Sequence, residues 1–191
     1  MENTNQNIRN KLKSQRAQLS LEHVKQSSIS ISKKVKTTGV FNDSQRIGFY
    51  HSVKGEADPS YLKTTNKEFF LPLLSKSEEG HLTYIEVTPD TRFENNKFNI
   101  PEPIFCDNLI TDAASLDLVI VPLVAFDRHK NRLGMGGGYY DRTFAFKQHN
   151  STKPILMGFA YDFQEINTIE TEWWDIGMDI IVTETRIIES L

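Results

Sequence analysis

Cysteine and long apolar segments are almost absent from this chain. The single cysteine, Cys106, has no partner for an internal disulfide, and no cysteine–histidine spacing predicts a zinc site. No apolar run approaches the roughly 18 residues typical of a membrane span, and the polar residues 1–7 are unlike a secretory signal. We therefore expect a cytoplasmic protein that contacts no membrane.

A strong excess of charge of either sign is also missing. The chain has 22 Lys and Arg against 25 Asp and Glu, a net charge of −3, which leaves no broad basic face. We therefore expect no nucleic-acid partner. Its 191 residues, 38% of them hydrophobic, suit one domain over 1–191, which we expect to be a monomer.

Apolar segments of strand length alternate with helical patterns, and this order predicts an α/β fold with a mainly parallel sheet. The clearest central strand is 116–121, which is short, apolar and rich in β-branched residues, and Pro122 ends it. Further strands are expected at 46–50, 68–71 (ended by Pro72), 82–87, 155–161 and 179–183.

Helices are expected at 8–19, at 59–65, at 139–148 and from Ser20, an N-cap, to Gly39. We expect 91–103 and the dozen residues after Pro122 to be irregular. A loop of that length in a compact domain is usually functional.

The run Arg132–Arg142 is the most informative stretch, because it holds Gly134, Gly136, Gly137 and Gly138. Glycines let backbone N–H groups approach phosphate oxygens, and a helix start favours anions. Its place after a central strand is where open parallel sheets bind ligands. Arg132 suits phosphate and Asp141 suits Mg²⁺. The alternative is a tight turn without a ligand, and the spacing matches neither a dinucleotide fingerprint nor a Walker A loop.

Together, Pro122–Asp127 and Arg132–Arg142 resemble the signature of the 5-formyltetrahydrofolate cyclo-ligase family. Weaker agreement covers the basic first helix, Gly55-Glu56, 99–103, 158–160 with Gln164, and 175–184. The resemblance implies a three-layer α/β/α fold similar to the NagB/RpiA/CoA-transferase group. It also implies the conversion of 5-formyltetrahydrofolate, with ATP and Mg²⁺, to 5,10-methenyltetrahydrofolate, ADP and phosphate.

The resemblance also implies roles for individual residues, with Arg132 and Tyr139 positioning the substrates. The expected metal ligands are Asp141 and Asp175, with Asp179 as the competing choice for the second. The folate would contact His51, Glu56, Phe98, Met135, Gly136, Gly137, Gly138 and Tyr139. ATP would contact Asn5, Arg9, Arg132, Leu133, Gly134, Met135, Gly136, Gly137, Gly138, Tyr139 and Tyr140.

Two positions depart from the family pattern, because many relatives have a basic residue where this chain has Asn5 and some have lysine where it has Gly137. Several of the expected site residues also have simpler structural interpretations. Phe98 suits a core, His51 a structural hydrogen bond and Asp175 a turn cap. The alternative function is a non-catalytic nucleotide- or folate-binding paralogue, against which the joint presence of Glu56, Arg132, Asp141 and Asp175 argues.

Overall fold

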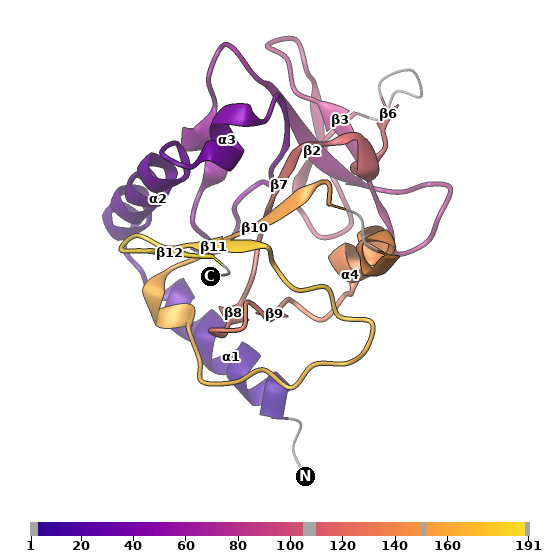
Figure 1. Ribbon diagram of the computed structural model, residues 1–191. Coiled ribbons are helices and arrows are strands. Elements are labelled where there is room, and N and C mark those ends of the chain that lie inside the picture. Colours follow the sequence, from indigo (N-terminus) through magenta and orange to yellow (C-terminus); the bar gives the residue numbers. More distant parts are fainter. Residues whose placement is uncertain (1–3, 105–109, 150–151, 190–191) are drawn as a thin grey trace.

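A computed structural model describes residues 4–104, 110–149 and 152–189 (Figure 1). Within them an eight-stranded sheet has the order β12-β11-β10-β7-β1-β2-β3-β6. The strands β11, β10, β7, β1 and β2 are parallel, and the antiparallel β12, β3 and β6 extend the two edges. The predicted α/β fold with a mainly parallel sheet is therefore confirmed. Its strands are β1 (Arg46–Gly48), β2 (Glu68–Leu74), β3 (Leu82–Glu86), β6 (Ile110–Thr111), β7 (Leu118–Val121), β10 (Ile155–Phe159), β11 (Ile180–Val182) and β12 (Ile187–Ile188).

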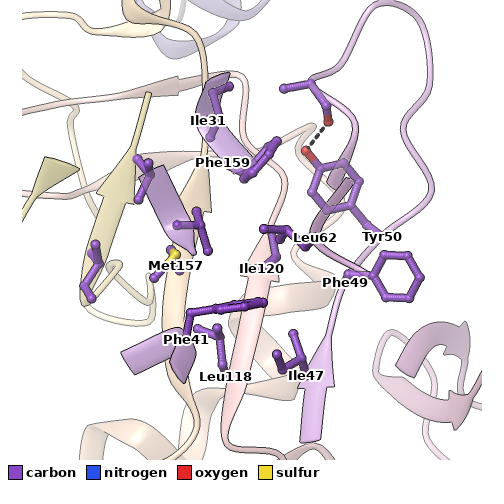
Figure 2. Close-up of a cluster of buried hydrophobic side chains, with 14 of the residues drawn as sticks. Ile31, Phe41, Ile47, Phe49, Tyr50, Leu62, Leu118, Ile120, Met157 and Phe159 are labelled. Carbon is purple, nitrogen blue, oxygen red and sulfur yellow. Dashed lines mark hydrogen bonds between the residues drawn. The ribbon is translucent and has the colours of Figure 1, made fainter. Parts of the chain in front are cut away.

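The central strand β7 is buried on both faces, as a parallel sheet covered by helices requires. Leu118 and Ile120 join the core on one face (Figure 2), where α2 (Leu21–Val35) and α3 (Gly39–Asp43) pack. Val119 and Val121 join the core on the other face, which contains Phe144 next to α4 (Tyr139–Thr143). Figure 1 shows α2 and α3 on one side of the sheet and α4 on the other, so the layers are helix, sheet and helix.

Two helices precede the first strand, and their boundary corrects one expectation. Ser20 caps α2 as predicted, because its hydroxyl accepts a hydrogen bond from the N–H of His23. Gly39 does not end that helix, which stops at Val35. The hydroxyl of Thr38 accepts from the N–H of Phe41 and starts α3 instead, so Gly39 is a first-turn residue. Before α2 lies α1 (Thr4–Ala17).

Strand β2 continues through Pro72, where we expected it to end. The carbonyl of Phe70 accepts from Phe49 on the β1 side, whereas that of Phe69 accepts from Val87 on the β3 side. By this alternation the nitrogen of Pro72 faces β1, whose pairing ends at Gly48 opposite Phe70. The missing N–H therefore costs no ladder hydrogen bond.

The two segments expected to be irregular each contain a short antiparallel hairpin. Strands β4 (Phe93–Asn95) and β5 (Pro101–Pro103) pair through residues 92, 96, 100 and 104, so the prolines occupy positions that donate nothing to the ladder. After Pro122, β8 (Ala125–Phe126) pairs with β9 (Arg132–Leu133). Asp127 closes that turn by accepting from the N–H groups of His129 and Asn131, which explains how a polar loop becomes ordered.

Two predicted helices are shorter than expected. The helix α4 gives way after Thr143 to a 3-10 helix, η4 (Ala145–His149), and the buried ring of Phe144 at this change contacts those of Tyr140 and Phe146. The segment expected as a helix over 59–65 is a single 3-10 turn, η1 (Pro59–Leu62), which Asp58 caps. No helix among the described residues has the length and apolar character needed to cross a bilayer.

Candidate functional site

The predicted site residues gather at the carboxyl edge of the parallel strands. Strand β1 leads there into the loop 51–58, and β7 leads through the hairpin β8–β9 into the glycine run. Helix α1 lies beneath that hairpin in Figure 1 and contacts β8. Chain order places these segments far apart, and the parallel pairing of β1 with β7 brings them together.

The glycine run forms an open turn that enters α4. Gly136 and Gly138 have φ values of +97° and +65°, in the left-handed region that favours glycine. Within the described chain, no N–H group of residues 134–138 donates a hydrogen bond. The Nε of Arg9 on α1 donates to the carbonyl of Gly134 over 2.9 Å and so fixes the turn from below.

Next to this turn, Arg132 and Asp141 form an ion pair between Nη2 and Oδ1. The arginine side chain is 4% exposed, and its guanidinium carbon lies 5.6 Å from the ring centroid of Tyr140. Burial raises the pKa of the Tyr140 phenol, although Arg132 opposes this, so Tyr140 is neutral at physiological pH. Tyr140 thus turns inward, an arrangement that leaves Tyr139 at the outer side of the helix start.

The backbone at Asp175 lies next to Asp141, whereas Asp179 lies elsewhere. The N–H of Ile176 donates to Oδ1 of Asp141 over 3.2 Å, which places the Asp175–Ile176 peptide beside that carboxylate. Asp175 also caps a turn by accepting from the N–H of Glu172. Asp179 instead lies at the amino end of β11, where it accepts from the N–H of Leu156 and pairs with Lys147.

The loop 51–58 places His51 and Glu56 at the end of β1. Glu56 is 9% exposed, and its Oε1 lies 3.2 Å from Nη2 of Arg16. Burial raises the pKa of Glu56, while Arg16 and the N–H of Val53 oppose the shift. Burial and the nearby Lys63 lower the pKa of His51, so its ring is neutral at pH 7. Its buried Nε2 has no hydrogen-bond partner among the described residues, and its ring meets Phe93 edge-on with centroids 5.5 Å apart.

Aromatic rings connect the hairpin β4–β5 with the glycine run. Phe98 is 53% exposed and its ring meets that of Tyr139 edge-on, with the centroids 6.0 Å apart. Phe98 is therefore not a core residue. Met135 is also exposed, whereas Leu133 is buried between β8 and α1, which leaves only its backbone facing the turn. Asn5 at the start of α1 donates to the carbonyl of Glu170.

A pocket of about 650 Å³ lies between Tyr139 and the turn that joins β2 to β3. Arg142 forms part of its wall, donating to the carbonyls of Gly80 and Gly137 and so linking the glycine run to the β2–β3 turn. The pocket is lined by Leu74, Ser75, Lys76, Glu79, Gly80, His81, Lys97, Tyr139 and Arg142.

Arg16 and Arg142 contact expected site residues, Glu56 and Gly137, but are not among the residues that we expected from the sequence. For Arg16 the sequence does contain a signal: it follows Arg9 by about two helical turns and so lies on the same face of the first helix. For Arg142 no spacing points to the carbonyl of Gly80, because the two residues meet only through tertiary packing.

The described side chains contain no group of three or more His, Cys, Asp or Glu residues able to hold a metal by themselves. A pair of carboxylates is nevertheless the donor set that Mg²⁺ uses when phosphate oxygens and water complete its shell. Asp141 and Asp175 fit that chemistry better than they fit a zinc or calcium site.

Two relatives resemble this chain in sequence over three quarters or more of its length. A 5-formyltetrahydrofolate cyclo-ligase of Haemophilus influenzae is 34% identical over 182 residues, 93% of this chain and 96% of the relative. The protein of that name from Escherichia coli K12 is 35% identical over 147 residues, 75% of this chain and 80% of its own length.

Solved structures agree as well. The 5,10-methenyltetrahydrofolate synthetase of Aquifex aeolicus superposes with a TM-score of 0.79 at 31% identity, covering 97% of this chain and 92% of that one. The synthetase of Mycoplasma pneumoniae has the same fold, with a TM-score of 0.72 at 21% identity over 95% of this chain and 99% of that one. The model of the 5-formyltetrahydrofolate cyclo-ligase family matches residues 1–184, and the chain therefore belongs to that family.

Proposed function

We propose that this protein converts 5-formyltetrahydrofolate and MgATP to 5,10-methenyltetrahydrofolate, ADP and phosphate. The observation that carries the proposal is the turn 134–138, whose N–H groups donate no hydrogen bond within the described chain. The turn also lies next to Arg132 and Tyr139, because a Cβ on Gly134 would be 3.3 Å from Nη1 of Arg132 and one on Gly137 would be 2.9 Å from the ring of Tyr139. That turn offers anion binding on the side of α1 and aromatic surface on the side of Phe98. The curated relatives named above carry the name of this reaction.

The chemistry explains why such a site needs positioning more than a reactive side chain. An N-formyl carbon is amide-like, and direct ring closure by N10 would have to expel oxide. Transfer of the γ-phosphoryl group to the formyl oxygen breaks the bond to ADP and forms an imidate-like phosphate. N10 then attacks the formyl carbon and loses its proton, and the C–O bond breaks to release phosphate. Alignment and charge neutralisation dominate steps of this kind.

On the nucleotide side, the backbone N–H groups of 134–138 would hold phosphate oxygens. Arg9, whose guanidinium lies within 3.9 Å of the position a Cβ on Gly136 would take, would add positive charge at the turn. Arg132, held on Asp141, would supply further charge next to the turn. Backbone donors and these two arginines would therefore replace the positive charge of the lysine that some relatives have in place of Gly137.

Asp141 and Asp175 would hold Mg²⁺, which screens the charge of the transferring phosphoryl group when bound. Oδ2 of Asp141 accepts no hydrogen bond within the described residues, so one oxygen remains for a cation while Oδ1 stays with Arg132 and Ile176. Asp175 likewise uses Oδ2 for its turn and keeps Oδ1 for a ligand.

On the folate side, Glu56 would accept hydrogen bonds from the N–H groups of the reduced pteridine. His51 supports this placement, because its buried Nε2 has no hydrogen-bond partner among the residues that the structure describes, and a polar ligand bound in the loop would supply one. Phe98 and Tyr139 would flank an aromatic ring of the substrate.

The direct test mixes the protein with 5-formyltetrahydrofolate, ATP and Mg²⁺ and follows methenyltetrahydrofolate by its absorbance. We expect product in equal amount to the ADP formed, and none when ATP or Mg²⁺ is left out. ATP binding without any product would contradict the proposal and favour a non-catalytic binding paralogue.

A further inference from the structure

The buried cation Arg16 is the feature that the proposed reaction does not yet use. Its side chain is 3% exposed, and Nη2 lies 3.2 Å from Oε1 of Glu56. The other carboxylate oxygen, Oε2, accepts from the N–H of Val53 over 3.1 Å. One oxygen is thus held by helix α1 and the other by the glutamate's own loop, which fixes the plane of the carboxylate.

The backbone of the loop is fitted to the same arginine. Gly55 has a φ of +78°, and a Cβ there would lie 2.6 Å from the carbonyl oxygen of Arg16, closer than any side chain permits. The hydroxyl of Tyr161 donates to the carbonyl of Gly55, and that of Tyr50 donates to the carbonyl of Ala57, the bond drawn in Figure 2. The loop therefore rests against α1 in one defined position.

Arg16 is also the charge that balances Glu56 in a poorly hydrated place. Arg16 is the one charged group among the described residues that shifts the pKa of this carboxyl. Glu56 in turn helps to raise the pKa of the phenols of Tyr50, Tyr140 and Tyr161, for which burial is the main cause, so these neighbours are neutral. Burial raises the pKa of Glu56, and the positive charge of Arg16 is the strongest effect that lowers it. Without the guanidinium, the carboxyl would bind a proton at higher pH and lose acceptor capacity.

The helix that carries Arg16 also supports the glycine run. Arg9, about two turns earlier on the same face, donates to Gly134, and the buried Leu12 packs between them. Helix α1 therefore contacts both the turn assigned to ATP and the loop assigned to folate, but through different arginines.

We propose that Arg16 is a positioning residue that holds the Glu56 carboxylate ionised and oriented toward the folate. The inference rests on the proposed function, because Glu56 contacts folate only if this protein takes folate as substrate. Arg16 itself touches no reacting atom.

The test compares steady-state kinetics of the wild type, Arg16→Gln and Arg16→Lys between pH 6 and pH 8.5. We expect Arg16→Gln to raise the KM for 5-formyltetrahydrofolate by about tenfold at pH 7, with the KM for ATP and the kcat much less affected. The defect should grow at pH 6 and shrink at pH 8.5, because the uncompensated carboxyl ionises only at higher pH. Arg16→Lys should recover part of the loss. Lys11→Gln, an exposed cation on the same helix, is the matched control.

A double-mutant cycle keeps the inference testable if Arg16→Gln alone folds poorly. Glu56→Gln with Arg16→Gln leaves no unpaired buried charge, so the double variant should fold. If Arg16 acts through Glu56, the double variant has the folate KM of Glu56→Gln alone. A further rise in KM, equal losses for ATP and folate, or a defect independent of pH would each overturn the inference. A wild type that makes no product contradicts the proposed function instead.

Discussion

At the scale of single residues, the pair Arg132–Asp141 joins stability to function. Arg132 is almost fully buried, and Asp141 is its only carboxylate partner among the described residues. Asp141→Asn would leave a buried guanidinium without a counter-charge. Such a loss costs roughly 3–5 kcal/mol in a fully buried pair, and we expect less here because the Asp141 side chain is 21% exposed. We therefore expect Asp141→Asn to lower the melting temperature as well as Mg²⁺-dependent turnover.

Asp175→Asn is the informative comparison, because the carboxylate of Asp175 caps one exposed turn and forms no ion pair with a cation in the described part of the chain. It should lose Mg²⁺-dependent turnover with little change in melting temperature. Thermal melts and Mg²⁺ titrations on both variants separate the two effects. A stable Asp141→Asn protein would contradict the structural importance of the pair, and a fully active Asp175→Asn protein would remove Asp175 from the metal site.

At the scale of elements, Asp117 joins the amino ends of three neighbouring strands. Asp117 directly precedes β7, and its carboxylate accepts from the N–H groups of Gln45 and Arg46 at the start of β1 and from the ammonium group of Lys153 before β10. Burial acts to raise its pKa, but the hydrogen bonds from Lys153, Arg46 and Gln45 outweigh this and lower the pKa to about 2. Because the pKa is depressed on folding, the stabilisation is complete above the unfolded value of about 3.9 and is lost as the pH falls toward 2.

Asp117→Asn should therefore lower the free energy of unfolding by about 1–2 kcal/mol, a value reduced from the full pKa shift because Lys153 is largely solvent-exposed. Urea denaturation should give the same difference from wild type at pH 7 and pH 5. The difference should shrink below pH 4. Asp43→Asn, an exposed carboxylate at the end of α3, serves as the control. A difference that already shrinks between pH 7 and pH 5 would refute this account.

The elements also show what the sequence alone can predict. A short, apolar, β-branched run such as Leu118–Val121 predicts a central strand from sequence alone, because a strand that is buried on both faces needs apolar residues at every position. The cap at Ser20 was equally predictable, since its hydroxyl acts on a residue three positions away. Local signals failed at Pro72 and Pro101, where tolerance of proline depends on which neighbouring strand faces the missing N–H.

For the site, too, features that depend on neighbouring residues can be predicted from the sequence, and features that depend on tertiary packing cannot. The glycine run and the family signature were readable because their residues are contiguous, and family membership is confirmed. The Arg16–Glu56 ion pair cannot be predicted from the sequence in this way. Its two residues are forty positions apart, and only the packing of α1 against the loop 51–58 brings them together. The residue roles in ligand binding remain predictions.

At the scale of the whole molecule, α1 and the turn 134–138 connect the two proposed substrates. Arg9 holds the turn and Arg16 holds Glu56 in the loop 51–58, which we propose binds folate, while the ring of Tyr139 meets that of Phe98. A ligand that orders this shared framework reduces the ordering cost for the other ligand. We therefore expect a non-hydrolysable ATP analogue with Mg²⁺ to lower the Kd of 5-formyltetrahydrofolate by about fivefold or more.

Thermodynamic linkage makes the expectation stricter, because the folate must lower the Kd of the analogue by the same factor. Calorimetry in both orders measures the two factors. Fluorescence gives a second readout, since the two tryptophans, Trp173 and Trp174, are exposed and directly precede Asp175. Arg9→Gln should weaken the coupling as well as nucleotide binding, because it detaches the turn from α1, whereas Lys11→Gln should leave the coupling unchanged. Equal folate affinity with and without the analogue would show that the two halves of the site bind independently, and α1 would then be a structural support only.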